Sequence, residues 1–242
     1  IQGTGKDGCE FLLVFDDGNF SEDNTFLLTD WLAHTPKEVL AKNFNVPEKA
    51  FAKIPASELY IFPSKVPGPL KDDRVKGAGP APLAYTHRML AQKPIETEFG
   101  SVRITDSTNF PISKTIAAGL VEIKPGGMRE LHWHPSADEW QFYISGEARM
   151  TVFGSQGNSR TFNFCAGDVG AVPAPMGHYI ENIGKTTLRF LEIFRTDVFS
   201  DVSLAQWLAF TPFDLVEAHL HIDKSILKNV STKKVPIVPT KK

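Results

Sequence analysis

The stretch "GGMRELHWHPSADEWQFYISG", residues 126–146, brings three candidate metal ligands close together in the sequence. His132 and His134 are two positions apart, and Glu139 follows five positions later. Residues i and i+2 of a strand point to the same face, so the two imidazoles share one side of the chain. Pro135 ends that strand, and the next strand begins at Glu139 after a turn. The carboxylate can therefore return to the pocket that the two imidazoles face.

A fourth candidate ligand lies further along, in "GDVGAVPAPMGHYIEN" (167–182), where His178 follows a predicted strand. Three neutral imidazole nitrogens and one carboxylate oxygen suit Mn, Fe, Co, Ni or Zn. Around a six-coordinate ion, this set leaves two positions open for a small chelating dianion or for dioxygen. The alternatives are a metal-free histidine pair in the core and an ion with a purely structural role. The complete ligand set at these spacings favours metal binding.

The pattern around these ligands predicts a mainly β domain. Between about 85 and 198, short alternating stretches are separated by Gly, Asn and Pro, a pattern typical of an antiparallel sandwich or small barrel. The stretches are "SVRITD", "AAGLVEIK", "EWQFYISG", "ARMTVFG", "RTFNF", "VGAVP" and "TLRFLEIF". We expect helices from about 203 to 228 and an extended basic tail over 229–242.

The chain also contains part of itself twice. "FLLVFDDGNFSEDNTFLLTDWLAHTPKEVLAKNF" (11–44) matches "FLEIFRTDVFSDVSLAQWLAFTPFDLVEAHL" (190–220), with Phe-Ser and Trp-Leu-Ala-x-Thr-Pro in both. We therefore expect residues 1–54 to be the terminal strand and helices of an upstream repeat. The Pro-containing stretch 55–84 is the predicted linker, and 85–228 is the metal-binding domain. On this interpretation the chain is the C-terminal portion of a two-repeat protein.

Composition narrows the choice of partners. The 242 residues carry a formal charge of −2 with scattered basic residues, which argues against nucleic acid as a partner. No apolar run approaches the roughly 18 to 20 residues that a membrane span requires.

The two cysteines, Cys9 and Cys165, are interpreted as buried thiols. Sequons at Asn19 and Asn229 favour a secreted or vacuolar location over a cytoplasmic one, without deciding the compartment.

Two motifs carry a resemblance to a known family. Residues 126–146 resemble the first cupin motif, and residues 167–182 resemble the second, with Pro175 in place of the usual glycine. Together with "FLEIF" and the following helices, they resemble the second domain of the bicupin oxalate decarboxylases over nearly the whole chain. This resemblance implies a double-stranded β-helix (cupin) barrel with flanking helices.

The resemblance also implies an activity. Members of the family hold Mn2+, here by His132, His134, Glu139 and His178, and cleave oxalate to formate and carbon dioxide with dioxygen as a cofactor. Family members form trimers and hexamers through their helices, so a homo-oligomer is expected. An oxalate oxidase of the germin kind, which releases hydrogen peroxide, is the nearest alternative. A non-catalytic domain whose metal stabilises an oligomer is another.

Two further residues are candidates for the chemistry. Glu192 alternates with apolar residues on one face of "LRFLEIF", and burial there should raise its pKa into a range useful for a base or acid. A purely structural buried ion pair is the alternative role. The resemblance assigns Arg129 to orienting oxalate, although strand parity puts Glu130 rather than Arg129 in step with His132. A bulge near residues 125–127 would remove this conflict, and a surface arginine is the alternative.

"FSEDNTF" (20–26) resembles the mobile lid of the upstream domain in that family, with Glu22 as its glutamate. The corresponding stretch beside the present metal site is "FSDVS" (199–203), which has no matching glutamate. A lid proton donor for the present site is therefore not predicted.

Overall fold

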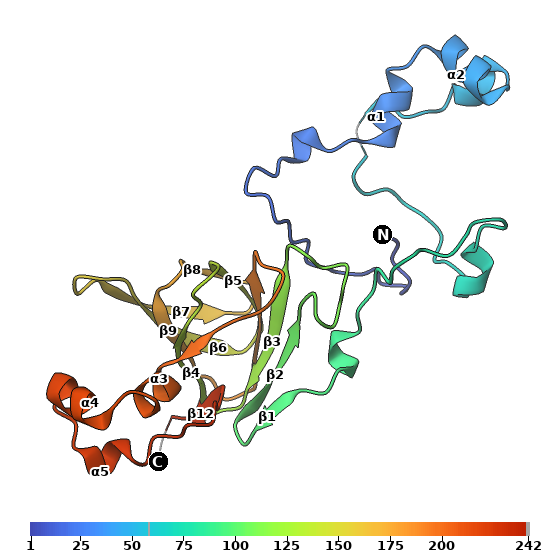
Figure 1. Ribbon diagram of the computed structural model, residues 1–242. Coiled ribbons are helices and arrows are strands. Elements are labelled where there is room, and N and C mark those ends of the chain that lie inside the picture. Colours follow the sequence, from blue (N-terminus) through green and yellow to red (C-terminus); the bar gives the residue numbers. More distant parts are fainter. Residues whose placement is uncertain (58, 241–242) are drawn as a thin grey trace. The chain divides into compact units, whose positions relative to one another are not determined.

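The computed structural model describes residues 1–57 and 59–240, and the side chain of Glu22 lies outside that description (Figure 1). The chain divides into two compact units, Ile1–Pro80 and Ala81–Lys242. Across the described residues, none of the helices combines the length and the apolar character that crossing a membrane requires.

The first unit consists of short helices and irregular segments. Its elements are η1 (Glu22–Asn24), α1 (Leu28–Ala33), α2 (Lys37–Phe44), η2 (Glu48–Phe51) and η3 (Leu70–Asp73). The prediction of a strand at residues 11–15, within the expected repeat fragment 1–54, is wrong. These residues are not in a strand, and Leu13 is 57% exposed. A strand needs a neighbour for its backbone hydrogen bonds, and the described part of this unit offers none.

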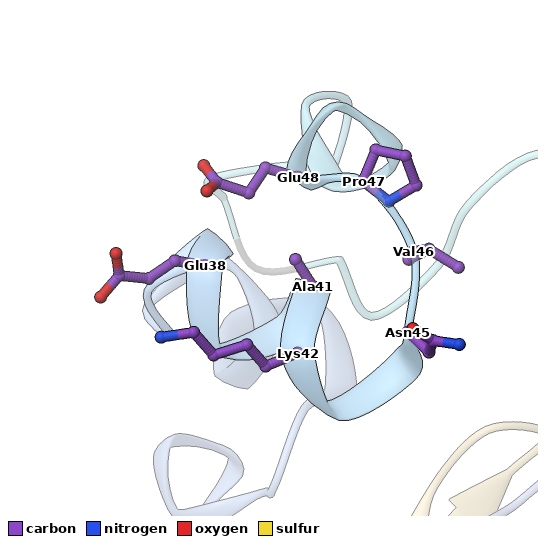
Figure 2. A pocket seen from close by; sticks show the side chains of 7 residues that line it. All are labelled: Glu38, Ala41, Lys42, Asn45, Val46, Pro47 and Glu48. Atoms are coloured by element: carbon purple, nitrogen blue, oxygen red, sulfur yellow. The ribbon is translucent and has the colours of Figure 1, made fainter.

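A hollow on this unit lies between α2 and η2 (Figure 2). It encloses about 480 Å3, and its charged lining groups are two carboxylates and one amine on an open surface. The lining residues are Glu38, Ala41, Lys42, Asn45, Val46, Pro47 and Glu48. No histidine or cysteine lines it, and it does not resemble the predicted metal site.

The repeated sequences have the same local geometry in both units. In each copy, a six-residue helix and an eight-residue helix are joined through Thr-Pro: α1 and α2 in the first, α3 (Leu204–Ala209) and α4 (Phe213–Leu220) in the second. Thr35 donates to the carbonyl of Trp31 at 2.8 Å, and Thr211 donates to that of Trp207 at 2.7 Å. The sequence match therefore reflects a shared helix–Thr-Pro–helix segment.

The second unit contains two antiparallel sheets. One has the order β1-β2-β3-β10-β5-β8 and the other the order β11-β4-β9-β6-β7, with β12 also paired to β4. The strands are β1 (Ile95–Thr97), β2 (Gly100–Thr105), β3 (Ala117–Ile123), β4 (Gly127–Trp133), β5 (Glu139–Ser145), β6 (Glu147–Phe153), β7 (Ser159–Cys165), β8 (Val169–Val172), β9 (Gly177–Asn182), β10 (Leu188–Phe194), β11 (Val202–Ser203) and β12 (Ile237–Pro239). The remaining helical elements are η4 (Met89–Ala91) and α5 (Lys224–Leu227).

The core between the sheets draws on both of them. Val121 and Phe190 come from one sheet and Met150 and Ile180 from the other, and each is at most 1% exposed. The alternation of apolar and polar residues along the strands requires such a shared interior. The predicted mainly β architecture with flanking helices is therefore confirmed (Figure 1).

An irregularity in β4 decides which of its side chains face inward. Arg129 pairs with Ile180 and His132 with His178, so β4 takes three steps where β9 takes two. This extra residue leaves Leu131 47% exposed, while Arg129 and His132 are each 1% exposed. The position predicted for the bulge, near residues 125–127, is wrong: the irregularity that turns Arg129 inward lies between Arg129 and His132.

The C-terminal tail forms one more strand than the sequence predicted, and the two cysteines are not buried. Within the extended tail, β12 pairs with β4, and Ile237 is 1% exposed in the core. Both Cys9 and Cys165 are exposed free thiols, so their assignment as buried residues is wrong. Cys165 ends β7, an edge strand that is exposed along most of its length.

Candidate metal centre

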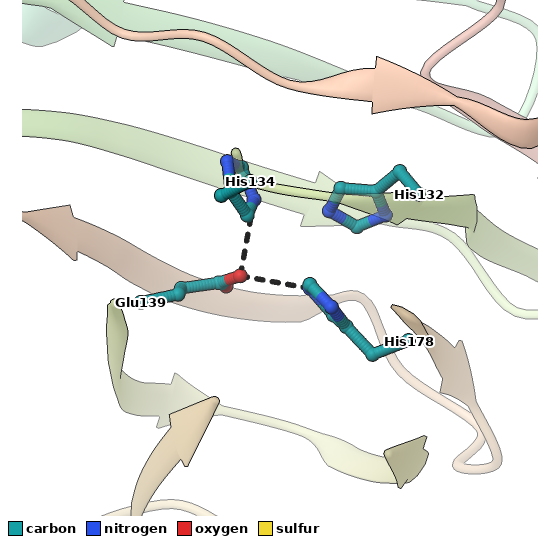
Figure 3. Close-up of side chains that lie close together, drawn as sticks. All are labelled: His132, His134, Glu139 and His178. Carbon is teal, nitrogen blue, oxygen red and sulfur yellow. Dashed lines mark ion pairs between the residues drawn. The ribbon is translucent and has the colours of Figure 1, made fainter. Parts of the chain in front are cut away.

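Four side chains, three from strands and one from the residue after β4, converge inside the second unit (Figure 3). His132 lies on β4, His134 directly follows β4, Glu139 begins β5, and His178 lies on β9. Each is at most 3% exposed, and one potential ligand atom from each lies within 4.8 Å of all the others. They form the one cluster of this kind within the described residues.

The outer nitrogen of each imidazole contacts a backbone carbonyl. The Nδ1 atoms of His132, His134 and His178 lie 2.7, 2.8 and 3.1 Å from the carbonyl oxygens of Glu130, Ser200 and Met176. A carbonyl only accepts, so Nδ1 must carry the proton in each ring. The Nε2 atoms then present lone pairs to the centre, as metal-ligating histidines do.

The inner atoms lack partners that could satisfy them. Glu139 Oε2 lies 3.2 Å from His134 Nε2 and 2.8 Å from His178 Nε2, as the dashed lines in Figure 3 mark. All three Nε2 atoms and this oxygen are buried without a hydrogen-bond partner. Acceptors facing one another at these distances need a shared proton or a cation between them. A metal ion held here would accept a lone pair from each of the four atoms.

The electrostatics fit a cation in this place. Burial raises the pKa of Glu139, but contact with His178 and His134 outweighs it and holds the carboxyl well below its usual range. Burial, together with nearby Arg129, holds the pKa of His132 well below its usual value, so this ring is neutral. The Glu139 contact outweighs burial at His134 and raises its pKa. A bound ion would displace that proton and take its place beside the carboxylate.

Arg129 and Glu192 lie together beside the cluster. Arg129 Nε is 3.4 Å from Glu192 Oε1, and their side chains are 1% and 0% exposed. Burial raises the pKa of Glu192 to about 7, an effect that Glu139 adds to and Arg129 opposes. Its second oxygen, Oε2, has no hydrogen-bond partner and lies where a Cβ on Gly119 would come within 3.0 Å. The carboxyl thus has one oxygen available to hold a proton.

Sequence reasoning missed Asp201, which contacts Arg129, and Lys234, which contacts Asp201. Asp201 accepts from Arg129 Nη2 at 2.6 Å and also pairs with Lys234 of the C-terminal segment. Burial raises the pKa of Asp201, but these two cations outweigh it and hold the pKa low. Asp201 is in the predicted lid-like stretch and Lys234 in the predicted tail, so neither had a pattern that marked it. A Pro236 carbonyl 3.4 Å from Arg129 Nη1 adds a third contact.

The stretch 199–203 is fixed against the cluster. Ser200 supplies the carbonyl for His134, and Ser203 Oγ donates to Glu130 Oε2 at 2.6 Å. The ring centroid of Phe199 lies 5.6 Å from that of His134. Glu22, the predicted lid glutamate, begins η1 in the first unit; its side chain lies outside the described part of the chain, and its role stays a prediction.

Fold and site together define a class of protein. A cupin family model matches residues 87–228, which include strands β1 to β11 and all four cluster residues, and the chain belongs to the cupin family. The predicted double-stranded β-helix barrel of that family is therefore confirmed.

Two relatives are similar to this chain over nearly its whole length. The chain is 59% identical over 237 residues to an oxalate decarboxylase of Bacillus subtilis, a match that covers 98% of this chain and 62% of that protein. It is 44% identical over 242 residues to a probable oxalate decarboxylase of Arthroderma benhamiae, covering 98% of this chain and 59% of the relative. The chain thus spans about three fifths of the length of these relatives.

Solved structures agree with this similarity. A structure of the B. subtilis oxalate decarboxylase at pH 4.6 matches with a TM-score of 0.89 and 58% identity, over 93% of this chain and 59% of that one. Another structure, of the same enzyme and its Mn(II) centres, matches with a TM-score of 0.89 and 58% identity, over 93% of this chain and 60% of that one.

Proposed function

We propose that this chain belongs to a Mn2+-dependent oxalate decarboxylase that converts oxalate to formate and carbon dioxide with dioxygen as a cofactor. The observation that carries the proposal is the buried set of three lone-pair nitrogens and one carboxylate oxygen, His132, His134, His178 and Glu139. The similarity to B. subtilis oxalate decarboxylase, an enzyme with Mn(II) centres, supports the choice of ion.

When bound, a redox-active Mn ion with dioxygen supplies the one-electron chemistry that weakens the oxalate C–C bond. His132, His134, Glu139 and His178 would hold that ion and leave room beside it for a small diacid. Arg129 would donate hydrogen bonds to an oxalate oxygen and stabilise the negative charge that builds up there. Its contacts with Asp201 and Glu192 hold the guanidinium in one orientation.

Glu192 would move the proton. Oxalate monoanion must lose its carboxyl proton before cleavage, and formate needs one hydrogen delivered to carbon after carbon dioxide leaves. A buried carboxyl with a pKa of about 7 and a partner-free Oε2 suits both steps near neutral pH. The net reaction balances without any other proton donor, because the proton taken up is the one returned.

The protein would act as a homo-oligomer, a trimer or hexamer. Large apolar side chains on the matching helix–Thr-Pro–helix segments support this: Trp31 is 56% exposed and Trp207 is 54% exposed. Exposed aromatic residues of this size are typical of surfaces that another subunit covers.

The test is product analysis with the Mn-loaded protein and oxalate. Equal amounts of formate and carbon dioxide support the proposal, and hydrogen peroxide in place of formate would identify an oxalate oxidase instead. Absence of both products with Mn bound would indicate a non-catalytic domain. Glu192→Gln and Arg129→Lys should each lower turnover, whereas the exposed-carboxyl control Glu147→Gln should not.

A further inference from the structure

A chain of polar side chains runs from the cluster into the core along one face of β5. Glu139, Gln141 and Tyr143 occupy alternate positions, and each is at most 1% exposed. Gln141 Nε2 lies 2.7 Å from Glu139 Oε1, and the Tyr143 hydroxyl lies 2.7 Å from Gln141 Oε1. Neither Gln141 nor Tyr143 has a role in the proposed reaction itself.

The direction of each hydrogen bond follows from chemistry. The Glu139 carboxylate only accepts, so the amide nitrogen of Gln141 must be the group that faces it. Tyr143 then donates to the amide oxygen, and burial raises the pKa of Tyr143, which keeps its hydroxyl protonated. The other amide hydrogen points to Met150 Sδ at 3.6 Å. Each N–H of the amide thus has a partner, and so has its oxygen.

The surrounding strands hold this amide in place. Gln141 pairs across the sheet with Glu192 on one side and with Gly170 on the other. A Cβ on Gly170 would lie 2.6 Å from Gln141 Oε1, so only glycine leaves the amide its position. The Tyr143 ring stacks on Phe164 with centroids 4.5 Å apart, which fixes the donor at the far end of the chain.

The hydrogen bond from Gln141 gives the two carboxylate oxygens of Glu139 different surroundings. Oε1 accepts from Gln141, while Oε2 faces His134 and His178 and has no hydrogen-bond partner. We propose that Gln141, oriented by Tyr143, is a positioning residue that makes Glu139 bind the metal through one oxygen only. A one-oxygen carboxylate occupies one coordination position and leaves an adjacent one for substrate. This inference deepens the proposed function and rests on a metal ion in the cluster.

The test compares metal affinity and metal spectroscopy in single variants. Gln141→Leu removes the amide, and Tyr143→Phe removes only the hydroxyl that orients it while keeping the stacked ring. Tyr179→Phe is the matched control, because its hydroxyl contacts Thr151 at 3.0 Å and makes no contact with the Glu139 chain. Metal-free proteins are titrated with Mn2+ alone and with Co2+ alone, and the Mn(II) EPR fine structure is recorded.

Gln141→Leu should weaken Mn2+ binding by about 10- to 100-fold and change the EPR fine structure, as loss of a hydrogen bond to a ligand does. Tyr143→Phe should change both in the same direction by less, and Tyr179→Phe should change neither. If Gln141→Leu does not fold, the result for Tyr143→Phe decides. Unchanged affinity and spectrum in a folded Tyr143→Phe and Gln141→Leu would overturn the inference.

Failure of the proposed function gives a different result. A wild-type protein that binds Mn2+ but makes no formate contradicts only the proposed function, because affinity and EPR do not depend on turnover. A wild-type protein that binds neither Mn2+ nor Co2+ would overturn the inference together with the metal centre.

Discussion

Replacing Glu192 by Gln removes a buried carboxyl that should make folding stability depend on pH. Burial raises its pKa from 4.5 to about 7, with Glu139 adding to the effect and Arg129 opposing it. The folded chain then holds this proton more tightly than the unfolded chain does. Stability from this group is fully present below about pH 4.5 and is lost as pH rises through about 7. The interval between the two pKa values corresponds to about 3 kcal/mol at about 1.36 kcal/mol per pKa unit.

Urea denaturation of the metal-free protein, followed by tryptophan fluorescence from about pH 4 to pH 8, measures this effect. The free energy of unfolding of the wild type should fall relative to that of Glu192→Gln by about 3 kcal/mol over the range. Titrating groups far from Glu192 cancel in the difference, and Glu147→Gln, which changes an exposed carboxyl, should follow the wild type. A difference between wild type and Glu192→Gln that stays constant, or that changes in the opposite direction, would refute a carboxyl that titrates near neutral pH.

Three further perturbations have expected outcomes. Asp201→Ala leaves the buried Arg129 guanidinium with one carboxylate fewer and should lower the free energy of unfolding by about 3 to 5 kcal/mol. Asp214→Ala, which breaks an exposed ion pair, should lower it by less than about 1 kcal/mol in the same urea titration. Gly170→Ala drives a methyl toward Gln141 and should cost about 1 to 3 kcal/mol, while Gly177→Ala meets open space and should change stability little; equal effects would contradict the packing argument. Removing the metal with a chelator should lower the melting temperature, because an ion at 100 times its Kd stabilises the folded state by about 2.7 kcal/mol. An unchanged melting curve would contradict a bound ion.

Three of the four ligands were predictable from local periodicity, and His178 was predictable from its own motif, residues 167–182. His132 and His134 share a strand face by their spacing alone, and the turn after Pro135 returns Glu139 to the same pocket. The strands around them were predictable for the same reason, since short alternating stretches specify both a period and a length.

Features that depend on pairing between distant segments were not predictable in the same way. The inward position of Arg129 requires an extra residue in β4, which shows only in the register against β9. Asp201 and Lys234 meet across 33 positions of sequence, in stretches predicted as a lid-like loop and a tail. The apolar stretch 11–15 has the pattern of a strand, but among the described residues of its unit there is no strand for it to pair with. The local sequence pattern does not show whether a strand has a neighbouring strand, or which distant residue a side chain contacts.

The most direct test of the metal centre is the manganese content of the purified chain after dialysis against Mn2+ and removal of loosely bound ions. The wild type should retain one Mn2+ per cluster, and His178→Ala, which removes one of the four inner ligand atoms, should retain far less. A wild type without manganese, or a His178→Ala variant that retains as much as the wild type, would contradict an ion held by these four side chains.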